Sequence, residues 1–235
     1  MPAPDLGDVF RDLSTPLVAD ACVRTGAPLR LAPPGLGPLV PGSRVAGQAL
    51  PVRHYGSVDV FLEAMENAAP GDVLVIDNGG RADEGCIGDL TVLEARAAGL
   101  AGLVVWGRHR DTAEVVSIGL PVFGCGRCPA GPVRLDPRED AAFVSARVGT
   151  CVVRRDDRVF ADDDGVLFVA AAHLEKVLAT ARAIAETERR QASAVREGRT
   201  LRDQLDFRTF IARRAKDPDY TFRRHLRALG GAIEE

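Results

Sequence analysis

Two short apolar segments, with a helix-forming segment between them, constrain the fold of this chain more than any other feature. Val73–Ile76 and Leu103–Trp106 are continuous runs of aliphatic or aromatic residues, typical of strands that are buried on both faces. Residues 90–98 between them have a helix-forming composition, and Gly99 follows. The pattern predicts a βαβ unit with parallel strands and a right-handed crossover.

Charged residues stand at the ends of this unit, where ligands bind in open α/β sheets. Asp89 precedes the helix as its predicted N-cap, and Arg110 and Asp111 follow the second strand. The N–H groups of Leu90 and Thr91 would then be free to hold a carboxylate or a phosphate. Two carboxylates without a nearby lysine favour a hard divalent cation with oxygen ligands. The alternative is that Asp89 only caps the helix and that the Arg-Asp pair is solvated.

Composition limits the kinds of protein that this chain can be. It has 235 residues, 46% of them hydrophobic, and a formal net charge of −3. This length suits one substantial domain or a domain with an appendage. The small negative charge argues against a general nucleic-acid binder, so no nucleic-acid partner is expected. No apolar run approaches membrane-spanning length and no signal peptide is evident, so we expect a soluble cytoplasmic protein.

Cysteines and lysines narrow the chemistry. The five cysteines are scattered, which favours reduced thiols. Cys125 and Cys128 have CxxC spacing, but no second ligand pair accompanies them, so a zinc site is not predicted. Lys176 and Lys216 are the only lysines, and neither lies near the predicted site in sequence. A Schiff-base mechanism needs a lysine nucleophile, so a metal-dependent mechanism is favoured.

The rest of the chain alternates predicted helices, strands and loops. Hydrophobic periodicity, together with the positions of proline and glycine, predicts helices over 5–27 (broken near Pro16), 58–68, 112–117 (capped by Thr112) and 174–196. Strands are predicted over 43–53, 121–124, 143–148, 151–153, 159–160 and 166–169, with a hairpin turn at 162–165. Loops are predicted over 28–43 and 125–139.

With these residues the chain resembles the class II pyruvate aldolases that cleave 4-hydroxy-4-methyl-2-oxoglutarate and 4-carboxy-4-hydroxy-2-oxoadipate. The same superfamily includes the regulator of ribonuclease activity A. Its hallmark is an Asp, a twenty-residue gap and Arg-Asp, which Asp89, Arg110 and Asp111 match without insertion. The resemblance covers roughly residues 10–200 and includes blocks at 13–21, 69–75, 119–123 and 161–166.

This resemblance implies a fold and an assembly. The expected fold belongs to the α/β class. It is a layered α/β/α swivelling-domain (RraA-like) fold with a C-terminal helical extension. Residues 1–198 would form the RraA-like aldolase core. Residues 199–235 would form the extension, which would dock on the core, contact another subunit or cover the pocket. The family forms homotrimers or hexamers with sites between subunits.

The resemblance also implies a reaction. It is a divalent-metal-dependent cleavage of a C–C bond in a small 2-oxo acid, by retro-aldol cleavage or decarboxylation through a pyruvate enolate. Mg²⁺ or Mn²⁺ would be bound directly by Asp111. A glutamate on the late helix of a neighbouring subunit would reach the same metal, and alignment points to Glu188, with Glu186 as the alternative.

The other roles follow from the same resemblance. The backbone N–H groups of Leu90 and Thr91 would hold the substrate carboxylate. Arg110 would donate to the keto oxygen that becomes the enolate. Asp89 would orient a water that exchanges protons with the enolate or the leaving hydroxyl.

Two departures from the family pattern leave the substrate open. His109 stands where the family commonly has an aliphatic residue, and we expect its side chain to point away from the site. Cys86 lies close to Asp89 in sequence and is expected to be a small apolar filler. A specialised biosynthetic lyase with another oxo-acid substrate is one alternative. The other is a non-catalytic regulator that binds a ribonuclease or another protein, although the retained Asp, Arg and Asp favour an enzyme.

Overall fold

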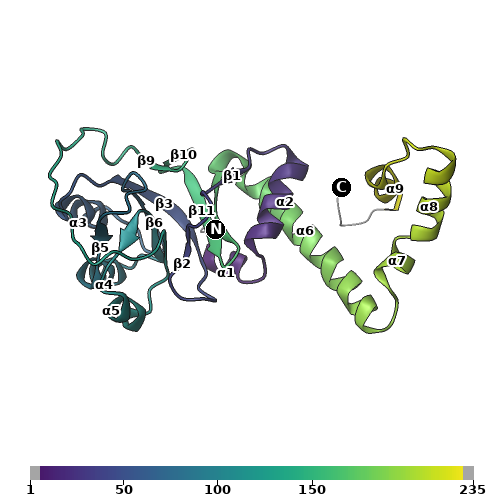
Figure 1. Cartoon of the computed structure of the whole chain (residues 1–235), viewed down its shortest axis with the longest axis horizontal. Helices are drawn as coiled ribbons and strands as arrows, with labels where there is room; N and C mark the ends of the chain where they lie inside the picture. Colours follow the sequence, from purple (N-terminus) through teal and green to yellow (C-terminus); the bar gives the residue numbers. More distant parts are fainter. Residues whose placement is uncertain (1–5, 230–235) are drawn as a thin grey trace.

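The computed structural model describes residues 6–229 and centres on an eight-stranded sheet with the order β1-β12-β11-β3-β4-β6-β8-β2 (Figure 1). The helices are α1 (Leu6–Phe10), α2 (Thr15–Thr25), α3 (Asp59–Glu66), α4 (Asp89–Ala97), α5 (Thr112–Ile118), α6 (Ala171–Arg196), α7 (Leu201–Gln204), α8 (Phe207–Lys216) and α9 (Phe222–Leu229). The strands are β1 (Arg30–Leu31), β2 (Gly37–Pro38), β3 (Val45–Arg53), β4 (Val73–Asp77), β5 (Gly85–Ile87), β6 (Gly102–Trp106), β7 (Arg108–His109), β8 (Val122–Gly124), β9 (Ser145–Val148), β10 (Cys151–Arg154), β11 (Asp157–Asp162) and β12 (Gly165–Ala170).

The predicted βαβ unit is confirmed. Strands β4 and β6 pair in parallel, in a register that places Val73 opposite Gly102 and Asp77 opposite Trp106, and α4 connects them. Strand β3 pairs in parallel with β4, and β8 with β6. Four strands therefore end at the same edge of the sheet, because parallel neighbours point the same way.

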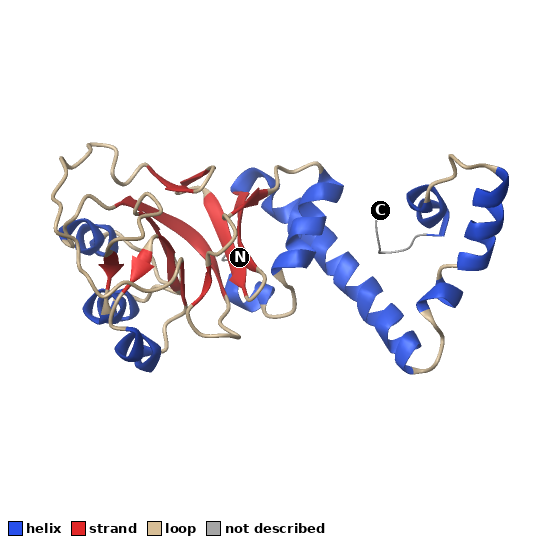
Figure 2. Ribbon diagram, in the orientation of Figure 1, coloured by secondary structure: helices blue, strands red, loops and turns tan. Residues whose placement is uncertain are grey.

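Helices cover the curled sheet in two groups (Figure 2). Helices α3, α4 and α5 pack on the parallel strands, against strand residues such as Leu74, Ile76 and Leu103. Helices α1, α2 and α6 pack on β11 and β12 around Phe160 and Leu167. The β9–β10 hairpin belongs to a third hydrophobic cluster, which shares the parallel strands with the first. The result is a mixed α/β fold in layers, as expected.

A buried carboxylate joins the start of α2 to the hairpin of β11 and β12. Asp162 lies at the end of β11, and its carboxylate accepts hydrogen bonds from the Thr15 N–H at 2.8 Å and the Thr15 hydroxyl at 2.5 Å. Pro16 in the first turn of α2 separates this helix from α1, as predicted. The three-aspartate segment is a hairpin turn, because Asp162 pairs with Gly165 across two antiparallel strands.

The C-terminal part of the chain leaves the core along α6. The last buried residue of this 26-residue helix is Ala185, and the rest of it projects away from the sheet (Figure 1). Helices α7, α8 and α9 follow it, and residues 201–229 are called the helical arm below. The predicted core over 1–198 includes residues 1–5 and the predicted extension over 199–235 includes residues 230–235, all of which lie outside the described part of the chain.

The structure differs from the sequence-based expectation at several short elements. Strands β5 and β7 pair in parallel with each other in a sheet of their own and were not predicted. They have three and two residues, too few to show a hydrophobic period. Strand β9 begins at Ser145 instead of residue 143, and β1 and β2 lie in the predicted loop. Across residues 6–229, every helix is too short or too polar to cross a membrane.

The Asp162 contact gives a prediction about stability. In Asp162→Ala, the buried Thr15 N–H and hydroxyl lose their charged acceptor, so the free energy of unfolding should fall by about 3 kcal/mol. Chemical denaturation measures this change. Asp164→Ala in the same turn is the matched control, because that side chain is exposed and should change stability by no more than about 0.5 kcal/mol. Equal losses in both variants would contradict the assignment.

Candidate active site

The carboxyl ends of the parallel strands bring the predicted site residues to one edge of the sheet. Beyond β4 and β6 the chain forms the small sheet of β5 and β7, in which Gly85 pairs with Arg108 and Ile87 with His109. Arg110 continues this pairing, since its N–H donates to the Ile87 carbonyl at 2.9 Å. The residues just after β7 are thereby placed beside the start of α4.

Arg110 and Asp111 lie directly against the backbone that precedes α4. A Cβ atom at Gly88 would clash with Asp111 Oδ2 and would lie 3.3 Å from Arg110 Nε. The Arg110 Nε and Asp111 Oδ2 atoms are 3.3 Å apart, and both side chains are partly exposed. Asp111 is the N-cap of α5 with φ of 55°, a left-handed conformation that costs about 1 kcal/mol or more in a residue other than glycine. The predicted cap, Thr112, was therefore wrong by one residue.

The structure also corrects the position of Asp89. Gly88 has an extended backbone and is the N-cap of α4, whereas Asp89 is the first helical residue. The Asp89 carboxylate turns back and accepts a hydrogen bond from the Leu90 N–H at 2.7 Å. The N–H of Leu90 is thus not free, contrary to expectation. The N–H of Thr91 lies in the same first turn, whose donors have no partner within a helix.

A loop over 126–136 covers the guanidinium of Arg110. A Cβ atom at Gly131 would lie 2.7 Å from Arg110 Nη1, so the backbone of this loop passes close to the charged group. The Gly85 N–H donates to the Ala130 carbonyl at 2.7 Å, which ties the loop to β5. Arg110 is therefore enclosed on one side while still 48% exposed on the other.

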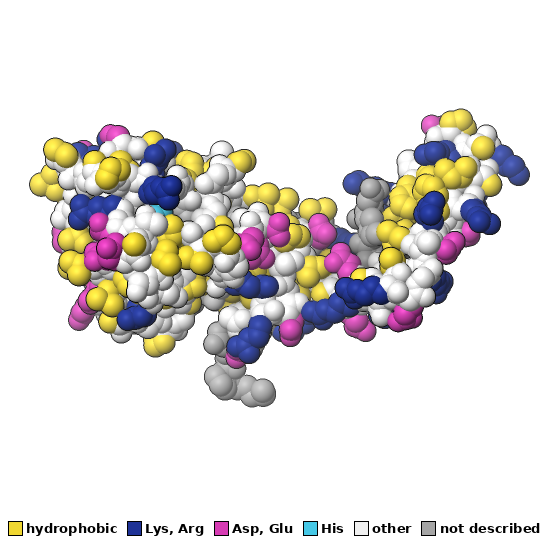
Figure 3. Space-filling view, turned by 60° about the horizontal axis from the view of Figure 1, so that its bottom comes forward, with side chains coloured by type: hydrophobic (Ala, Val, Ile, Leu, Met, Phe, Trp, Pro, Cys, Tyr) yellow, Lys and Arg dark blue, Asp and Glu magenta, His cyan; other side chains and the backbone are white. Residues whose placement is uncertain are grey.

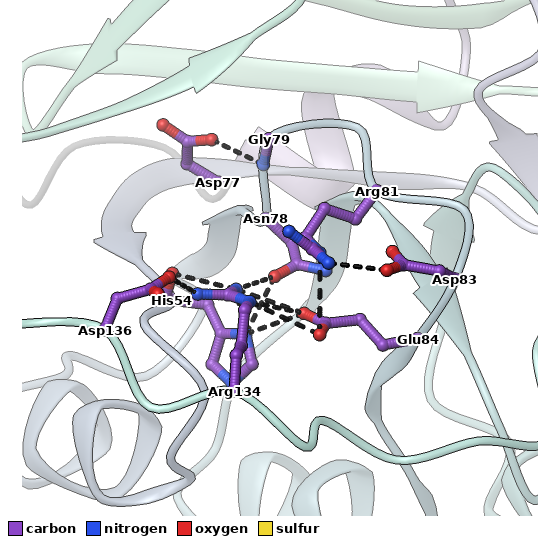
Figure 4. Close-up of polar contacts among 9 residues, drawn as sticks. All are labelled: His54, Asp77, Asn78, Gly79, Arg81, Asp83, Glu84, Arg134 and Asp136. Carbon is purple, nitrogen blue, oxygen red and sulfur yellow. Dashed lines mark hydrogen bonds and ion pairs between the residues drawn. The ribbon is translucent and has the colours of Figure 1, made fainter.

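A buried polar cluster anchors the same loop and was not predicted from local sequence patterns. The cluster consists of His54, Asn78, Glu84 and Arg134 (Figure 4). Asn78 Oδ1 accepts hydrogen bonds from His54 Nδ1 and Arg134 Nη2, both at 2.8 Å. Arg134 Nη2 also donates to Glu84 Oε1 at 3.1 Å. Glu84 is 3% exposed, and its charge is compensated by Arg134 and by Arg81, whose Nε lies 3.5 Å from Glu84 Oε2.

The cluster connects the loop to the strand ends. Glu84 immediately precedes β5, Asn78 follows β4 and His54 follows β3, whereas Arg134 comes from the loop that covers Arg110. His54 and Arg134 are 80 residues apart, a separation that no local pattern reveals. The one available signal was the turn after β4, which contains Asn78. Within residues 6–229, Asn78 Nδ2 is the buried side-chain donor without a hydrogen-bond partner, and it packs against Gly107.

Four other residues singled out by the sequence lie near the site or in the core beside it. His109 is buried at the end of β7, and its Nε2 lies 3.1 Å from the hydroxyl oxygen of Thr112, the first residue of α5. That its side chain points away from the site stays a prediction. Cys86 packs in the hydrophobic core, and burial raises the pKa of its thiol to about 12. Cys125 and Cys128 are half-buried free thiols, and burial raises the pKa of Cys125.

Comparison with known proteins identifies the family. The family model described as RraA-like, Aldolase/RraA, matches residues 15–168. The chain belongs to the RraA-like family.

Two curated relatives illustrate its range. The protein DlpA of Legionella pneumophila is 32% identical over 191 residues, which are 77% of this chain but only 30% of DlpA. A protein of Halalkalibacterium halodurans named "Putative 4-hydroxy-4-methyl-2-oxoglutarate aldolase" is 30% identical over 148 residues, which are 62% of this chain and 69% of that protein. This chain thus spans about a third of the first relative and most of the second.

Solved structures agree with the fold. An uncharacterised Pseudomonas syringae protein matches with a TM-score of 0.74 and 28% identity, over 85% of this chain and 96% of that one. RraAS2 of Streptomyces coelicolor, described as an unusual member of the RNase ES inhibitor RraA family, matches with a TM-score of 0.70 and 28% identity. That match covers 83% of this chain and all of RraAS2.

The candidate site holds few possible metal ligands within one chain. Among residues 6–229, no group of three or more His, Cys, Asp or Glu side chains is arranged to bind a metal ion. Asp111 lies against Gly88, next to Asp89, so two carboxylates occur at this edge. Mg²⁺ commonly takes one or two carboxylates and keeps several waters, so this donor set fits it. Glu188 is exposed on the projecting half of α6, far from α4 and α5 in the same chain (Figure 1).

The contact at Gly88 predicts a variant with a defect confined to the site. Gly88→Ala places a Cβ atom against the Asp111 carboxylate, which must move away from the start of α4. Any activity that depends on Asp111 should fall at least about tenfold, since small displacements of positioned groups are costly. The far-ultraviolet circular dichroism spectrum should stay unchanged. Gly80→Ala is not a suitable control, because its Cβ atom would meet the Trp106 ring. Gly119→Ala is the control: its Cβ atom meets no other atom, and its only cost is backbone strain at a left-handed residue that ends α5.

Burial of His54 predicts a pH dependence of stability. Burial lowers the pKa of His54 below its usual value, so the unfolded chain binds the proton more tightly. The free energy of unfolding should therefore fall as the pH drops through about 6.5, by at most about 1.4 kcal/mol per pH unit for this one group. His54→Gln keeps a donor for Asn78 and should flatten the slope measured by denaturation between pH 7 and 5. His173→Gln, an exposed change on α6, should leave the slope unaltered.

Proposed function

We propose that this protein is a divalent-metal-dependent lyase that breaks a C–C bond in a 2-oxo acid, by retro-aldol cleavage or decarboxylation. The supporting observation is the contact of Arg110 and Asp111 with the backbone at Gly88. It brings a guanidinium, the carboxylate of a residue with a left-handed backbone, and the positive end of a helix to one partly exposed position. The relative named as an aldolase supports the same class of reaction.

The chain's own residues would act on charge and protons. The keto oxygen of the substrate gains negative charge as the C–C bond breaks, and the Arg110 guanidinium stabilises that charge where it develops. The substrate carboxylate lies at the start of α4 and accepts hydrogen bonds from the N–H groups of Thr91 and Leu90. On the Leu90 N–H it replaces the Asp89 carboxylate. Asp89 is then free to orient a water, which accepts the hydroxyl proton in the aldol case and returns a proton to the enolate carbon to give pyruvate.

A metal ion would be held by Asp111, with waters and the substrate as further ligands. We propose Mg²⁺ or Mn²⁺, because the donors are carboxylate oxygens. Such a cation is a Lewis acid that polarises the keto group. Glu188 of the partner subunit, with Glu186 as the alternative, would supply the carboxylate that one chain lacks. The proposal therefore includes a homotrimer or hexamer.

A regulator is the second candidate, and one comparison favours it. RraAS2 is described as a member of an RNase inhibitor family and matches this chain over its full length. A protein-binding role would use the surface and would not require Arg110 and Asp111 to be held beside α4. Their arrangement favours the enzyme, with a narrower oxo-acid substrate as the remaining alternative.

A coupled assay tests the proposed reaction. Pyruvate release from oxaloacetate and from 4-hydroxy-4-methyl-2-oxoglutarate is followed with lactate dehydrogenase, with Mg²⁺, Mn²⁺ or excess chelator. Metal-dependent release is expected, and Arg110→Ala should lower kcat by about 10²–10³-fold because a charge-stabilising donor is lost. Arg108→Ala, two residues earlier, is the control and should retain activity. Equal release by Arg110→Ala and the unaltered protein would reject the mechanism.

A further inference from the structure

The helical arm is a structured part of the chain that the proposed chemistry does not use. Its centre is aromatic: the ring centroids of Phe210 and Phe222 are 4.8 Å apart, and Tyr220 packs nearby. Buried His225 donates from Nε2 to the Leu205 carbonyl at 2.9 Å and fixes α9 against the end of α7. These contacts give the arm a defined shape and a defined outer surface.

The arm is too small to be stable alone and has little support from the core. It has fewer than the roughly 40 residues below which a domain usually needs disulfides, metals or association. It is joined to the core by the half of α6 beyond Ala185, which contributes no buried residue. In Figures 1 and 2 the arm stands apart from the sheet. A stable docking surface is therefore expected outside its own chain.

Charge separates the arm from the rest of the molecule. Residues 201–229 hold eight of the 30 Lys and Arg residues and four of the 33 Asp and Glu residues, a net charge of +4. The rest of the chain has 22 basic against 29 acidic residues, a net charge of −7. Figure 3 shows basic side chains spread over the arm, at the right of the view. A second copy of the same chain thus offers a surface of opposite charge.

One outer face of the arm is apolar with a basic end. Arg208, Ile211, Ala212 and Ala215 of α8 have helical spacing and are all exposed, Ile211 by 41%. The other side of α8 packs inward through Phe210, which is 3% exposed. An isolated exposed isoleucine is common, but Ile211 shares its helix face with Ala212, Ala215 and Arg208.

A matching groove lies beside the candidate active site. Helices α4 and α5 enclose a shallow hollow of about 400 Å³ with Leu93, Ala113 and Ile118 in its lining. The same lining contains two acidic side chains, Asp89 and Glu114. Leu90 of α4 is 75% exposed next to it, so this surface combines apolar and acidic groups.

We propose that the helical arm of one copy docks in the α4–α5 groove of a second copy. Ile211 would pack on Leu93 and Ile118, and Arg208 would pair with Glu114. This inference rests in part on the proposed function, in which Glu188 reaches Asp111 of a second copy. From Glu188 to the end of α6 at Arg196 the helix runs about 12 Å. The arm that follows α6 would therefore lie beside Asp89 of that second copy. The arm would then form one wall of the site and restrict the substrates that enter.

Photo-crosslinking between labelled copies tests the contact. The full chain with p-benzoylphenylalanine in place of Ile211 is mixed with ¹⁵N-labelled unaltered chain and irradiated. Mass spectrometry should find crosslinks that join residue 211 to peptides of residues 89–118 from the other isotope. Crosslinks confined to one chain, to a different element or to co-purified nucleic acid would overturn the proposal.

A charge exchange tests the pairing of Arg208 and Glu114. Arg208→Glu and Glu114→Arg should each lower the yield of the intermolecular crosslink about tenfold, because like charges then face each other. The double variant should recover most of the yield. Arg227→Glu on α9 is the matched control and should keep it. A double variant no better than either single variant would contradict this contact.

The two proposals can fail separately. Pyruvate release by the unaltered protein without crosslinks between copies would reject the arm contact and leave the lyase intact. Crosslinks between copies without metal-dependent pyruvate release would leave the arm contact intact and reject the lyase. If both hold, Ile211→Asp should change KM or the preference between the two substrates more than it changes metal dependence.

Discussion

The parallel pairing of β4 with β6 is the constraint on which the rest of the site depends. Both strands are buried on both faces, so their aliphatic residues fix the register and the direction together. Because the strands are parallel, their carboxyl ends meet at one edge, and the chain that follows each must turn there. This places the start of α4 beside Arg110 and Asp111, although twenty residues separate Asp89 from Arg110.

The loop over Arg110 is held by a different kind of interaction. Glu84 and Arg134 are taken out of water, and a buried pair of this kind adds little net stability. What it provides is a fixed geometry, because without Arg134 the buried Glu84 would keep only the more distant Arg81 as a counter-charge. Asn78 and His54 complete the arrangement with hydrogen bonds at 2.8 Å. The cluster is therefore best understood as the fixed support for the loop that encloses one side of the site.

Local pattern predicted the fold and the placement of Asp89, Arg110 and Asp111 at one edge of the sheet, and it failed where distant segments determine the detail. The apolar runs, the helix near Asp89 and the hairpin turn at Asp162 were all read from neighbouring residues. The cap of α4 was misplaced by one residue because Gly88 is required by the close approach of Asp111, which follows in the chain. The Arg134 cluster joins segments up to 80 residues apart and shows no period.

The shape of α6 links assembly to chemistry. Its last buried residue is Ala185, and the exposed helix beyond carries Glu186 and Glu188 away from the carboxylates of its own chain (Figure 1). A single chain thus has Asp89 and Asp111 at one end of the molecule and these glutamates toward the other. If a third carboxylate is needed at Asp111, a second copy must supply it, and the arm must accompany it.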